Sequence, residues 1–246
     1  MLPLTQVDRA RAPAPAARAK SSIEIAGLNL PAEERGGDFC DCVPLDSFRL
    51  AVAIGDACGH GLRASRCGTE TRARLEALLL AGCDPGLTLR RVNRELARTL
   101  PDGWFVSLLI VELDARSGSL RYASAGHTPA LLMRAEPDRI DELAPTGPAL
   151  GIFEDASFET AEISPLSAGD LLLMHTDGVT EAKGPGRQRF GMDRVKHHLR
   201  GLRSLPVASF VMRLADELRR FRAGGCQSDD CSMVAIKAFE LCRIGT

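Results

Sequence analysis

The chain has 246 residues, of which 45% are hydrophobic and 26% charged, as in an ordinary globular domain. Its formal net charge of −1 gives no field that would attract nucleic acid or an anionic membrane, and a single Trp and a single Tyr argue against a base-stacking surface. No apolar run is long enough to span a bilayer, and the N-terminus lacks the apolar stretch of a secretory signal. We therefore expect a cytoplasmic protein with no nucleic-acid or membrane partner.

Residues 1–21 are rich in Ala, Pro and Arg and have little to bury, so we expect a flexible lead-in. β-Branched and apolar residues alternate from residue 22, where we expect the folded domain to begin and to extend to residue 242. Further apolar segments predict strands at 49–54, 105–113, 119–123, 171–175 and 231–239. Residues 114–118 are the predicted turn of a hairpin between the second and third of these.

Helices are predicted between the strands. Asp84 is a typical N-cap residue and Pro85 suits a first helical turn, after which apolar residues recur on one face as far as residue 96. Residues 206–222 carry an apolar stripe with arginines opposite, and residues 62–80 are helical by composition. Runs of strands separated by long helices favour one α+β domain with antiparallel sheets.

The eight cysteines include no Cys-x-x-Cys pair, and no His pair has the spacing of a zinc knuckle. A structural zinc site is therefore not expected. Without a secretory signal, free thiols are the expected state of these cysteines.

Acidic residues recur beside glycine or at the ends of predicted strands in four segments, 36–41 (GGDFCD), 55–61 (GDACGHG), 176–178 (TDG) and 228–230 (SDD). Each segment alone has a plainer interpretation, because Asp56 could cap the next helix and Asp177-Gly178 is a common turn dipeptide. Together they suit hard divalent cations, which take oxygen ligands and keep several waters. The four segments therefore predict a metal site assembled from both halves of the chain.

Two divalent ions that share a bridging carboxylate and a bridging water would generate hydroxide near neutral pH. In-line attack at phosphorus depends mainly on positioning and charge neutralisation, so no Ser, Cys or His nucleophile is needed. The pattern thus indicates metal-dependent phosphoryl hydrolysis.

The ordered motifs GGDFCD, GDACGHG, SAGHTPALL, TDGVTEA and SDDCSMVAI resemble the SpoIIE/RsbU-type bacterial branch of the metal-dependent PPM (type 2C) serine/threonine protein phosphatases. The resemblance covers roughly residues 23–240. It implies an α-β-β-α sandwich of two antiparallel sheets flanked by helices. It also implies two Mn²⁺ or Mg²⁺ ions that hydrolyse phosphoserine or phosphothreonine on a protein. The substrate it suggests is a STAS-type anti-anti-sigma factor in a partner-switching pathway. Regulation by a separate partner, by expression level or by assembly stays open.

Matched position by position, the resemblance implies the metal ligands Asp38, Asp56, the carbonyl of Ala57, Asp177 and Asp229. Asp56 is the expected bridge between the two ions, and Asp38 and Asp56 are the expected catalytic carboxylates. The arginine that clamps phosphate in eukaryotic relatives has no counterpart, since Arg35 is interpreted as a solvated loop residue.

Neighbouring polar residues are assigned supporting roles. Asp230 and Asp41 are expected to be structural, although Asp41 could contact a metal-bound water. His60 and His127 are candidates for protonating the leaving group, and a role in holding its loop is favoured for His127. His175 is expected in the core or behind the ligands.

Two other functions remain open from the residues. A pseudophosphatase that binds a phosphoprotein without turnover is disfavoured because all four aspartates are present. A phosphatase of small phosphate esters would differ by its activity on para-nitrophenyl phosphate relative to a phosphoprotein.

Overall fold

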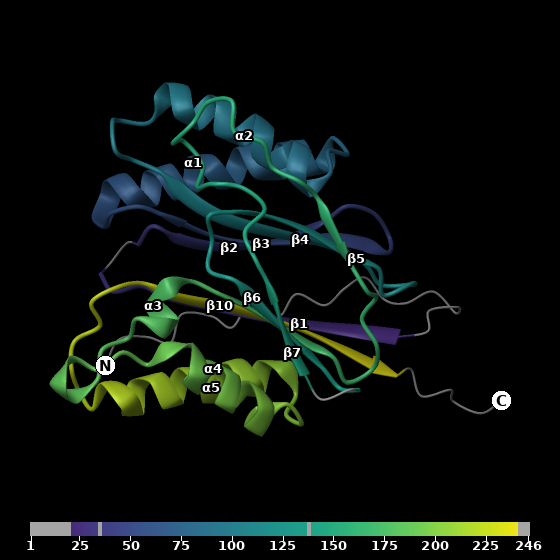
Figure 1. Cartoon of the computed structure of the whole chain (residues 1–246), viewed down its shortest axis with the longest axis vertical. Coiled ribbons are helices and arrows are strands. Elements are labelled where there is room, and N and C mark those ends of the chain that lie inside the picture. The colour runs from purple at the N-terminus through teal and green to yellow at the C-terminus, as the bar shows by residue number, and fades with distance from the viewer. Residues whose placement is uncertain (1–20, 34–35, 137–138, 241–246) are drawn as a thin grey trace.

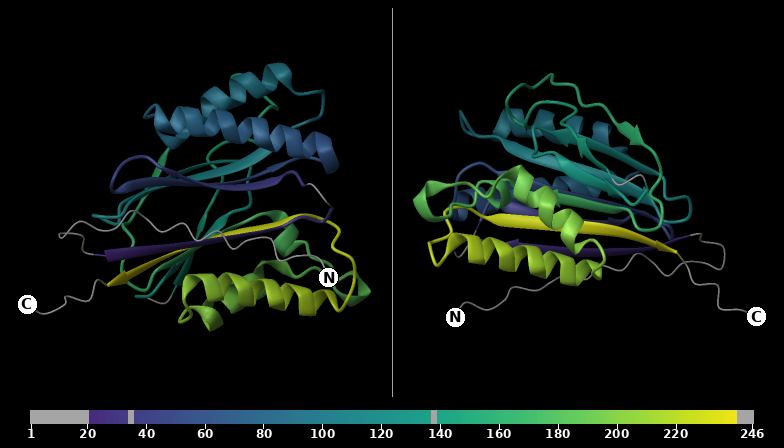
Figure 2. Two further views of the ribbon diagram at one scale, coloured as in Figure 1. Left: turned by 180° about the vertical axis from the view of Figure 1, so that it is seen from behind. Right: turned by 60° about the horizontal axis from the view of Figure 1, so that its bottom comes forward.

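Two antiparallel sheets packed face to face form the centre of the molecule, and helices cover both outer faces (Figures 1 and 2). The computed structural model describes residues 21–33, 36–136 and 139–240. Helices α1 and α2 lie over one sheet, and α4 and α5 lie over the other. The α+β fold, with its α-β-β-α sandwich, is confirmed.

Within the described residues each sheet has five strands. The first sheet contains, in spatial order, β1 (Ser21–Leu30), β10 (Cys231–Glu240), β9 (Leu171–His175), β6 (Ala130–Arg134) and β7 (Arg139–Leu143). The second contains β2 (Asp38–Pro44), β3 (Arg49–Ala57), β4 (Val106–Asp114), β5 (Leu120–Ala125) and β8 (Ala161–Ile163). The helical segments are α1 (Gly61–Leu80), α2 (Pro85–Thr99), α3 (Asp177–Thr180), the 3₁₀ turn η1 (Pro185–Arg187), α4 (Gly191–Leu202) and α5 (Val207–Arg222).

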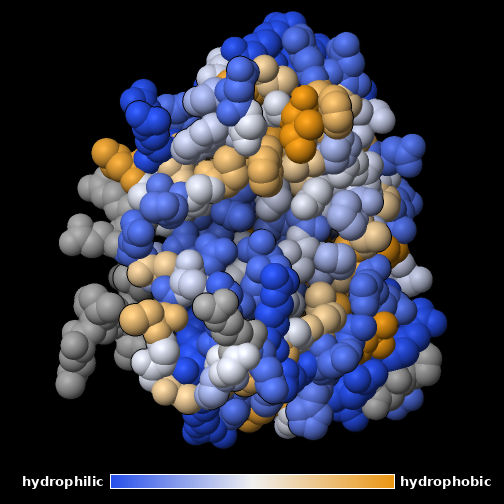
Figure 3. Space-filling view, turned by 60° about the vertical axis from the view of Figure 1, so that its left-hand side comes forward, coloured by the Kyte–Doolittle hydropathy of each residue, from blue (hydrophilic) through white to orange (hydrophobic). Residues whose placement is uncertain are grey.

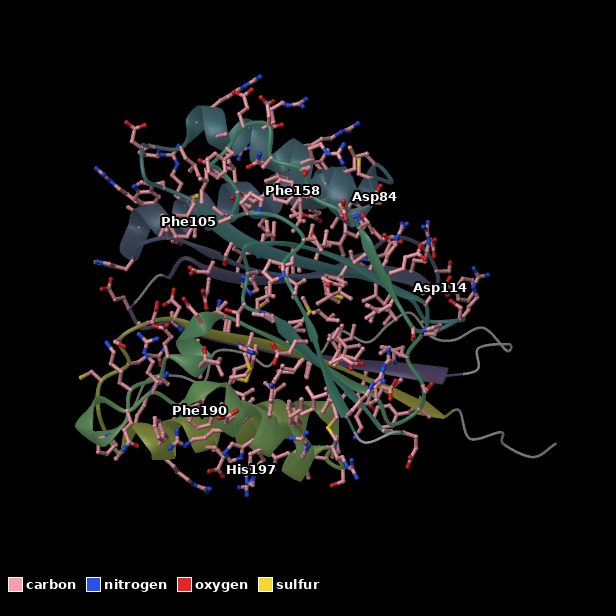
Figure 4. All side chains as sticks on the ribbon, viewed as in Figure 1. Asp84, Phe105, Asp114, Phe158, Phe190 and His197 are labelled. Atoms are coloured by element: carbon pink, nitrogen blue, oxygen red, sulfur yellow. The ribbon has the colours of Figure 1, made fainter. Side chains whose placement is uncertain are left out.

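Apolar side chains form three layers because strand residues alternate between the two faces of a sheet. On β3, Val52 and Ile54 point into the layer between the sheets, whereas Ala51 and Ala53 belong to the layer under α1 and α2. The helix layers are anchored by large buried rings such as Phe158 under α2, Phe190 beside α4 and Phe210 on α5 (Phe158 and Phe190 in Figure 4). Fully burying a side chain of this kind contributes about 1.5–3 kcal/mol.

Helix α2 begins where the sequence predicted. The Asp84 carboxylate accepts a hydrogen bond from the Leu87 N–H at 3.0 Å, and Pro85 occupies the first turn. Thr160 Oγ1 also donates to Asp84 at 2.7 Å, which ties the start of the helix to the segment before β8. The cap therefore serves both local and tertiary structure.

Most predicted strands are confirmed, with shifted ends. Strand β4 begins at Val106, one residue later than predicted, because Phe105 lies outside the ladder and is 39% exposed. The β4–β5 hairpin turns through Gly118, whose φ of 72° favours glycine. Strands β2, β6, β7 and β8, helices α3 and α4 and the 3₁₀ turn η1 were not among the predicted elements.

The domain bounds 1–21 and 22–242 remain predictions. Residues 1–20, Arg35 and Cys242 lie outside the described residues, while Ser21 is the first residue of β1. No helix in the described part of the chain is long and apolar enough to cross a membrane.

The predicted acidic segments meet at one end of the sandwich because of strand direction. Asp38 opens β2 and is the cross-strand partner of Asp56 near the end of β3. In the other sheet, β9 ends two residues before Asp177, and its neighbour β10 begins two residues after Asp229. Seen from this end, hydrophilic residues fill the middle of the face, with a hydrophobic group above them (Figure 3).

Candidate active site

Four carboxylates from the two sheets gather at this end, and repulsion between them adds to the effect of burial. Burial is the first cause that raises the pKa of Asp38, Asp56, Asp177 and Asp229 above the usual range of aspartate. Like charges add to the rise, because Asp56 acts on Asp38, and Asp177 and Asp229 act on Asp56. The structure thus brings together the four aspartates that the sequence singled out.

None of the four carboxylates has an ion-pair partner in the described part of the chain, although Lys183 is close enough to Asp229 to lower its pKa. Among the described residues, no Lys or Arg side chain forms an ion pair with any of them. Nor are three or more Asp, Glu, His or Cys side chains in the described ranges already arranged around one metal position. The cluster is therefore an open group of negative charges, and it is not a closed cage.

The donor chemistry of this group fits a divalent cation of the Mg²⁺ type. Such ions bind through one or two carboxylates and keep several waters, so a closed cage of side chains is not required. The carbonyl oxygen of Ala57 is next to Gly37, where an added Cβ would lie only 2.3 Å from it. Glycine at position 37 therefore lets the start of β2 approach this carbonyl, and the Ala57 N–H donates to the Gly37 carbonyl at 3.3 Å.

Thr176 orients the Asp38 carboxylate, a role that sequence reasoning missed. Its hydroxyl accepts a hydrogen bond from the Ser232 N–H at 3.0 Å and donates to Asp38 Oδ2 at 2.8 Å. Because Thr176 is fully buried, its single hydroxyl proton is committed to that carboxylate. The residue links β9, β10 and β2, and its position before Asp177-Gly178 was the available signal.

Asp230 holds the backbone around the cluster. Its carboxylate accepts hydrogen bonds from the Ala32 N–H at 2.8 Å and from the Asp38 N–H at 3.4 Å. Two glycines make room for it, since a Cβ on Gly36 would lie 1.8 Å from its Oδ2 and one on Gly178 1.8 Å from its carbonyl oxygen. Asp230 therefore fixes the start of β2 relative to β10.

Asp41 is directed away from the cluster. Successive strand residues face opposite sides, so Asp41 lies on the α1 side of β2 while Asp38 faces the other sheet. Arg72 of α1 donates to both Asp41 oxygens, at 2.7 and 3.1 Å. The alternative that Asp41 contacts a metal-bound water therefore has no support in this geometry.

The side chains of His127 and His175 are both buried. Nδ1 of His127 lies 2.7 Å from the hydroxyl of Ser107, which is the cross-strand partner of Asp56. Burial, reinforced by His175 nearby, lowers the pKa of His127 to about 3, so its ring is neutral at pH 7. His60 is exposed and lies 3.3 Å from Glu33.

The described cysteines are all free thiols, as predicted. Burial raises the pKa of Cys231 to about 12. Its thiol lies 2.8 Å from the Gly178 carbonyl and receives a hydrogen bond from Arg222. This contact connects the end of α5 with the segment that carries Asp177.

A cavity of about 560 Å³ adjoins the cluster along β2. It lies between β1, β2 and the first half of α1, and its walls include Asp38, Cys40 and Arg72. Of the four gathered carboxylates, only Asp38 reaches it. The carboxylate cluster itself is thus an open surface at the end of the sandwich.

The sandwich is that of a PP2C-type phosphatase domain. The phosphatase domain of SpoIIE from Bacillus subtilis superposes with a TM-score of 0.78 at 24% identity, over 90% of this chain and 65% of that one. The PP2C domain of SiaA from Pseudomonas aeruginosa superposes with a TM-score of 0.78 at 21% identity, over 87% of this chain and 85% of that one. The structure of the RsbU and RsbW domains of Rv1364c from Mycobacterium tuberculosis superposes with a TM-score of 0.71 at 27% identity. The superposition covers 91% of this chain and 62% of that one.

Residues 46–239 match the family model described as Stage II sporulation protein E (SpoIIE), and the chain belongs to this family. The phosphoserine phosphatase RsbU of Bacillus subtilis (strain 168) is 26% identical over 164 residues, which cover 67% of this chain and 48% of RsbU. The phosphoserine phosphatase RsbP of the same organism is 25% identical over a segment that covers 85% of this chain and 50% of RsbP. The chain therefore carries a phosphatase domain and spans about half the length of these two relatives.

Proposed function

We propose that this chain is a divalent-cation-dependent protein phosphatase that hydrolyses phosphoserine or phosphothreonine. The observation that carries the proposal is the group of four carboxylates at one end of the sandwich, none of which forms an ion pair with a described Lys or Arg. Mutual repulsion of this kind costs stability unless a cation offsets it. Membership of a family with named phosphoserine phosphatases supports the same chemistry.

The proposed ligands are Asp38, Asp56, the carbonyl of Ala57, Asp177 and Asp229, holding two Mn²⁺ or Mg²⁺ ions with Asp56 between them. A structure of the fold neighbour RsbX in complex with magnesium is consistent with a hard cation in this fold. When bound, such ions acidify water and neutralise phosphoryl oxygens, which is the chemistry that phosphate ester hydrolysis needs.

The chain's own residues prepare the site for this chemistry. Thr176 fixes the orientation of Asp38, while Asp230 holds the backbone on which Asp38 sits. His127 is neutral and close to Ser107, so we assign it the task of holding the loop behind Asp56 and not that of a proton donor. Preorganisation of this kind spares the site reorganisation during the reaction.

We further propose a phosphorylated STAS-type anti-anti-sigma factor as the substrate, within a partner-switching pathway, and a separate protein that regulates the activity. The resemblance to RsbU, RsbP and the RsbU and RsbW domains of Rv1364c supports this assignment. The fold alone does not select a substrate.

Phosphate release from a phosphoserine protein tests the proposal. The natural chain and Asp56→Asn are compared with Mn²⁺ and with EDTA, and para-nitrophenyl phosphate serves as the small-ester substrate. We expect turnover that requires Mn²⁺, is lost in Asp56→Asn and is faster on the phosphoprotein. Equal rates for the two proteins would remove Asp56 from the mechanism, and a preference for the small ester would favour that class of phosphatase.

A further inference from the structure

Two cationic side chains stand at the rim of the carboxylate cluster. They line a small polar pocket of about 110 Å³, together with Gly178, Glu181, Ser228 and Asp229. Lys183 is exposed at its mouth, and Arg222, at the end of α5, is half-buried. The pocket shares Asp229 with the cluster, and Gly178 directly follows Asp177, so the two sites are continuous.

The negative groups in this pocket are already engaged. Glu181 accepts a hydrogen bond from Arg189 at 2.6 Å, and Asp229 belongs to the proposed ligand set. Lys183 is close enough to Asp229 to lower its pKa, against the larger effect of burial, which raises it. No described carboxylate lies within ion-pair distance of Lys183 or Arg222.

Arg222 is held in place by uncharged partners. It donates to Gln227 Oε1 at 2.8 Å and to Cys231 Sγ at 2.8 Å, and that thiol is neutral because burial raises its pKa. A guanidinium has five N–H donors, so these two bonds leave others available. Lys183 attracts Asp229, but neither Lys183 nor Arg222 has an ion-pair partner among the described residues.

The position of this charge suits a substrate that runs past the cluster in an extended form. Neighbouring residues of such a chain are about 3–7 Å from the phosphorylated one. The pocket shares Asp229 with the cluster and is therefore adjacent to it. Its small volume and polar walls favour a carboxylate over a large or apolar side chain.

We propose that Lys183 and Arg222 form a specificity subsite that binds the carboxylate of an Asp or Glu next to the phosphorylated residue of the substrate. The inference rests on the proposed phosphatase function and adds a sequence preference to it.

Lys183→Ala is the informative variant, because the side chain is exposed and has no hydrogen bond to lose. Its kcat and KM are measured on a phosphoserine peptide with acidic residues within two positions, on the same peptide with Asn and Gln instead, and on para-nitrophenyl phosphate. We expect KM for the acidic peptide to rise about fivefold, with the other two substrates changed less than twofold. The rise should shrink in 0.5 M salt, since exposed ionic contacts are screened.

Two further variants separate the subsite from a general effect of charge. Lys183→Arg should keep the preference for the acidic peptide. Lys196→Ala removes the same charge from α4, where Lys196 is paired with Glu142, and should leave the preference intact. Equal losses of Lys183→Ala on all three substrates would mean that Lys183 contacts the phosphoryl group, and no change would mean that it contacts no anion; either result overturns the proposal.

Binding separates failure of the subsite from failure of the phosphatase function. Fluorescence polarisation of non-hydrolysable phosphonate analogues of the acidic and neutral peptides is measured on the natural chain and on Lys183→Ala with Mn²⁺ present. A preference for the acidic peptide that Lys183→Ala abolishes supports the subsite even if no turnover occurs. Equal affinity of the natural chain for both peptides contradicts the subsite even if turnover is rapid.

Discussion

Strand β9 has a carboxylate near each end, and the two differ in whether the protein pairs them with a cation. Just before the strand, buried Asp170 is paired with Arg134 at 2.8 Å and accepts hydrogen bonds from the backbone N–H groups of Ala135 and Ser167. Just beyond its other end, Asp177 joins a group of carboxylates that form no ion pair with a described Lys or Arg. At the start of β9 the charge of Asp170 is thus offset by Arg134 within the protein. At the other end of β9, where the carboxylates form no ion pair with a described residue, we expect a cation from solution to bind.

The largest difference between the two ends should appear in catalysis. Asp56→Asn is expected to lower kcat on a phosphoserine protein by on the order of a thousandfold, because bound cations supply several kcal/mol of transition-state stabilisation. The same change removes one of the repelling charges, so the thermal midpoint of the metal-free protein should rise. Phosphate release and thermal melting in EDTA check the two parts, and a lower midpoint would contradict the unpaired state of the cluster.

The paired end should respond in stability. Arg134→Met leaves Asp170 buried without a cation and is expected to cost about 3–5 kcal/mol of unfolding free energy. Arg139→Met, which breaks an exposed ion pair with Asp141 on β7, should cost less than about 1 kcal/mol. Denaturant unfolding measures both values, and similar costs for the two variants would contradict the structural role of the buried pair.

A smaller effect is expected for the residue that orients Asp38. Thr176→Val keeps the shape of the side chain but removes the hydroxyl, which should weaken Mn²⁺ affinity about 10–100-fold, as loss of a ligand's supporting hydrogen bond does elsewhere. Thr176→Ser retains the hydroxyl, so its Mn²⁺ affinity should stay close to that of the natural chain. Calorimetric Mn²⁺ titration distinguishes them, and equal weakening by both would point to packing as the cause.

The mildest test uses pH. Burial and like charge raise the pKa of Asp38 to about 8, above the unfolded value near 4, so the folded metal-free protein binds more protons across this interval. Its stability should therefore fall as pH rises through it. Bound Mn²⁺ removes that loss and adds about 2.7 kcal/mol at a hundredfold excess over Kd. The midpoint in Mn²⁺ minus that in EDTA should be larger at pH 8 than at pH 5.5, and a pH-independent difference would contradict the charge cluster.

Local signals in the sequence predicted much of this fold. Asp84-Pro85 marked the start of α2, and apolar runs marked β3, β9 and β10. Strand β7 escaped prediction because its sequence RIDEL carries three charges on an edge strand, and β8 because it has only three residues. Short edge strands form because they pair with neighbouring strands, and their own residues show little of the apolar alternation that predicts a strand.

The site, like the fold, contains some residues that the sequence predicted and others that it did not. The four aspartates were recognisable because glycine turns and strand ends accompany them in sequence. The contacts of Thr176 were not, because they join segments up to 138 residues apart. The direction of Asp41 followed from strand alternation only once β2 was known to begin at Asp38, since Asp41 then faces α1.

Calorimetric titration of Mn²⁺ tests the central claim most directly, because it asks whether the carboxylate end of the sandwich binds a cation at all. The natural chain is compared with Asp56→Asn and with Asp193→Asn, which removes an exposed carboxylate from α4. We predict binding to the natural chain and to Asp193→Asn, and a loss of at least tenfold in affinity for Asp56→Asn. Equal affinity in all three proteins, or no binding to any, would contradict the assignment of this end as a metal centre.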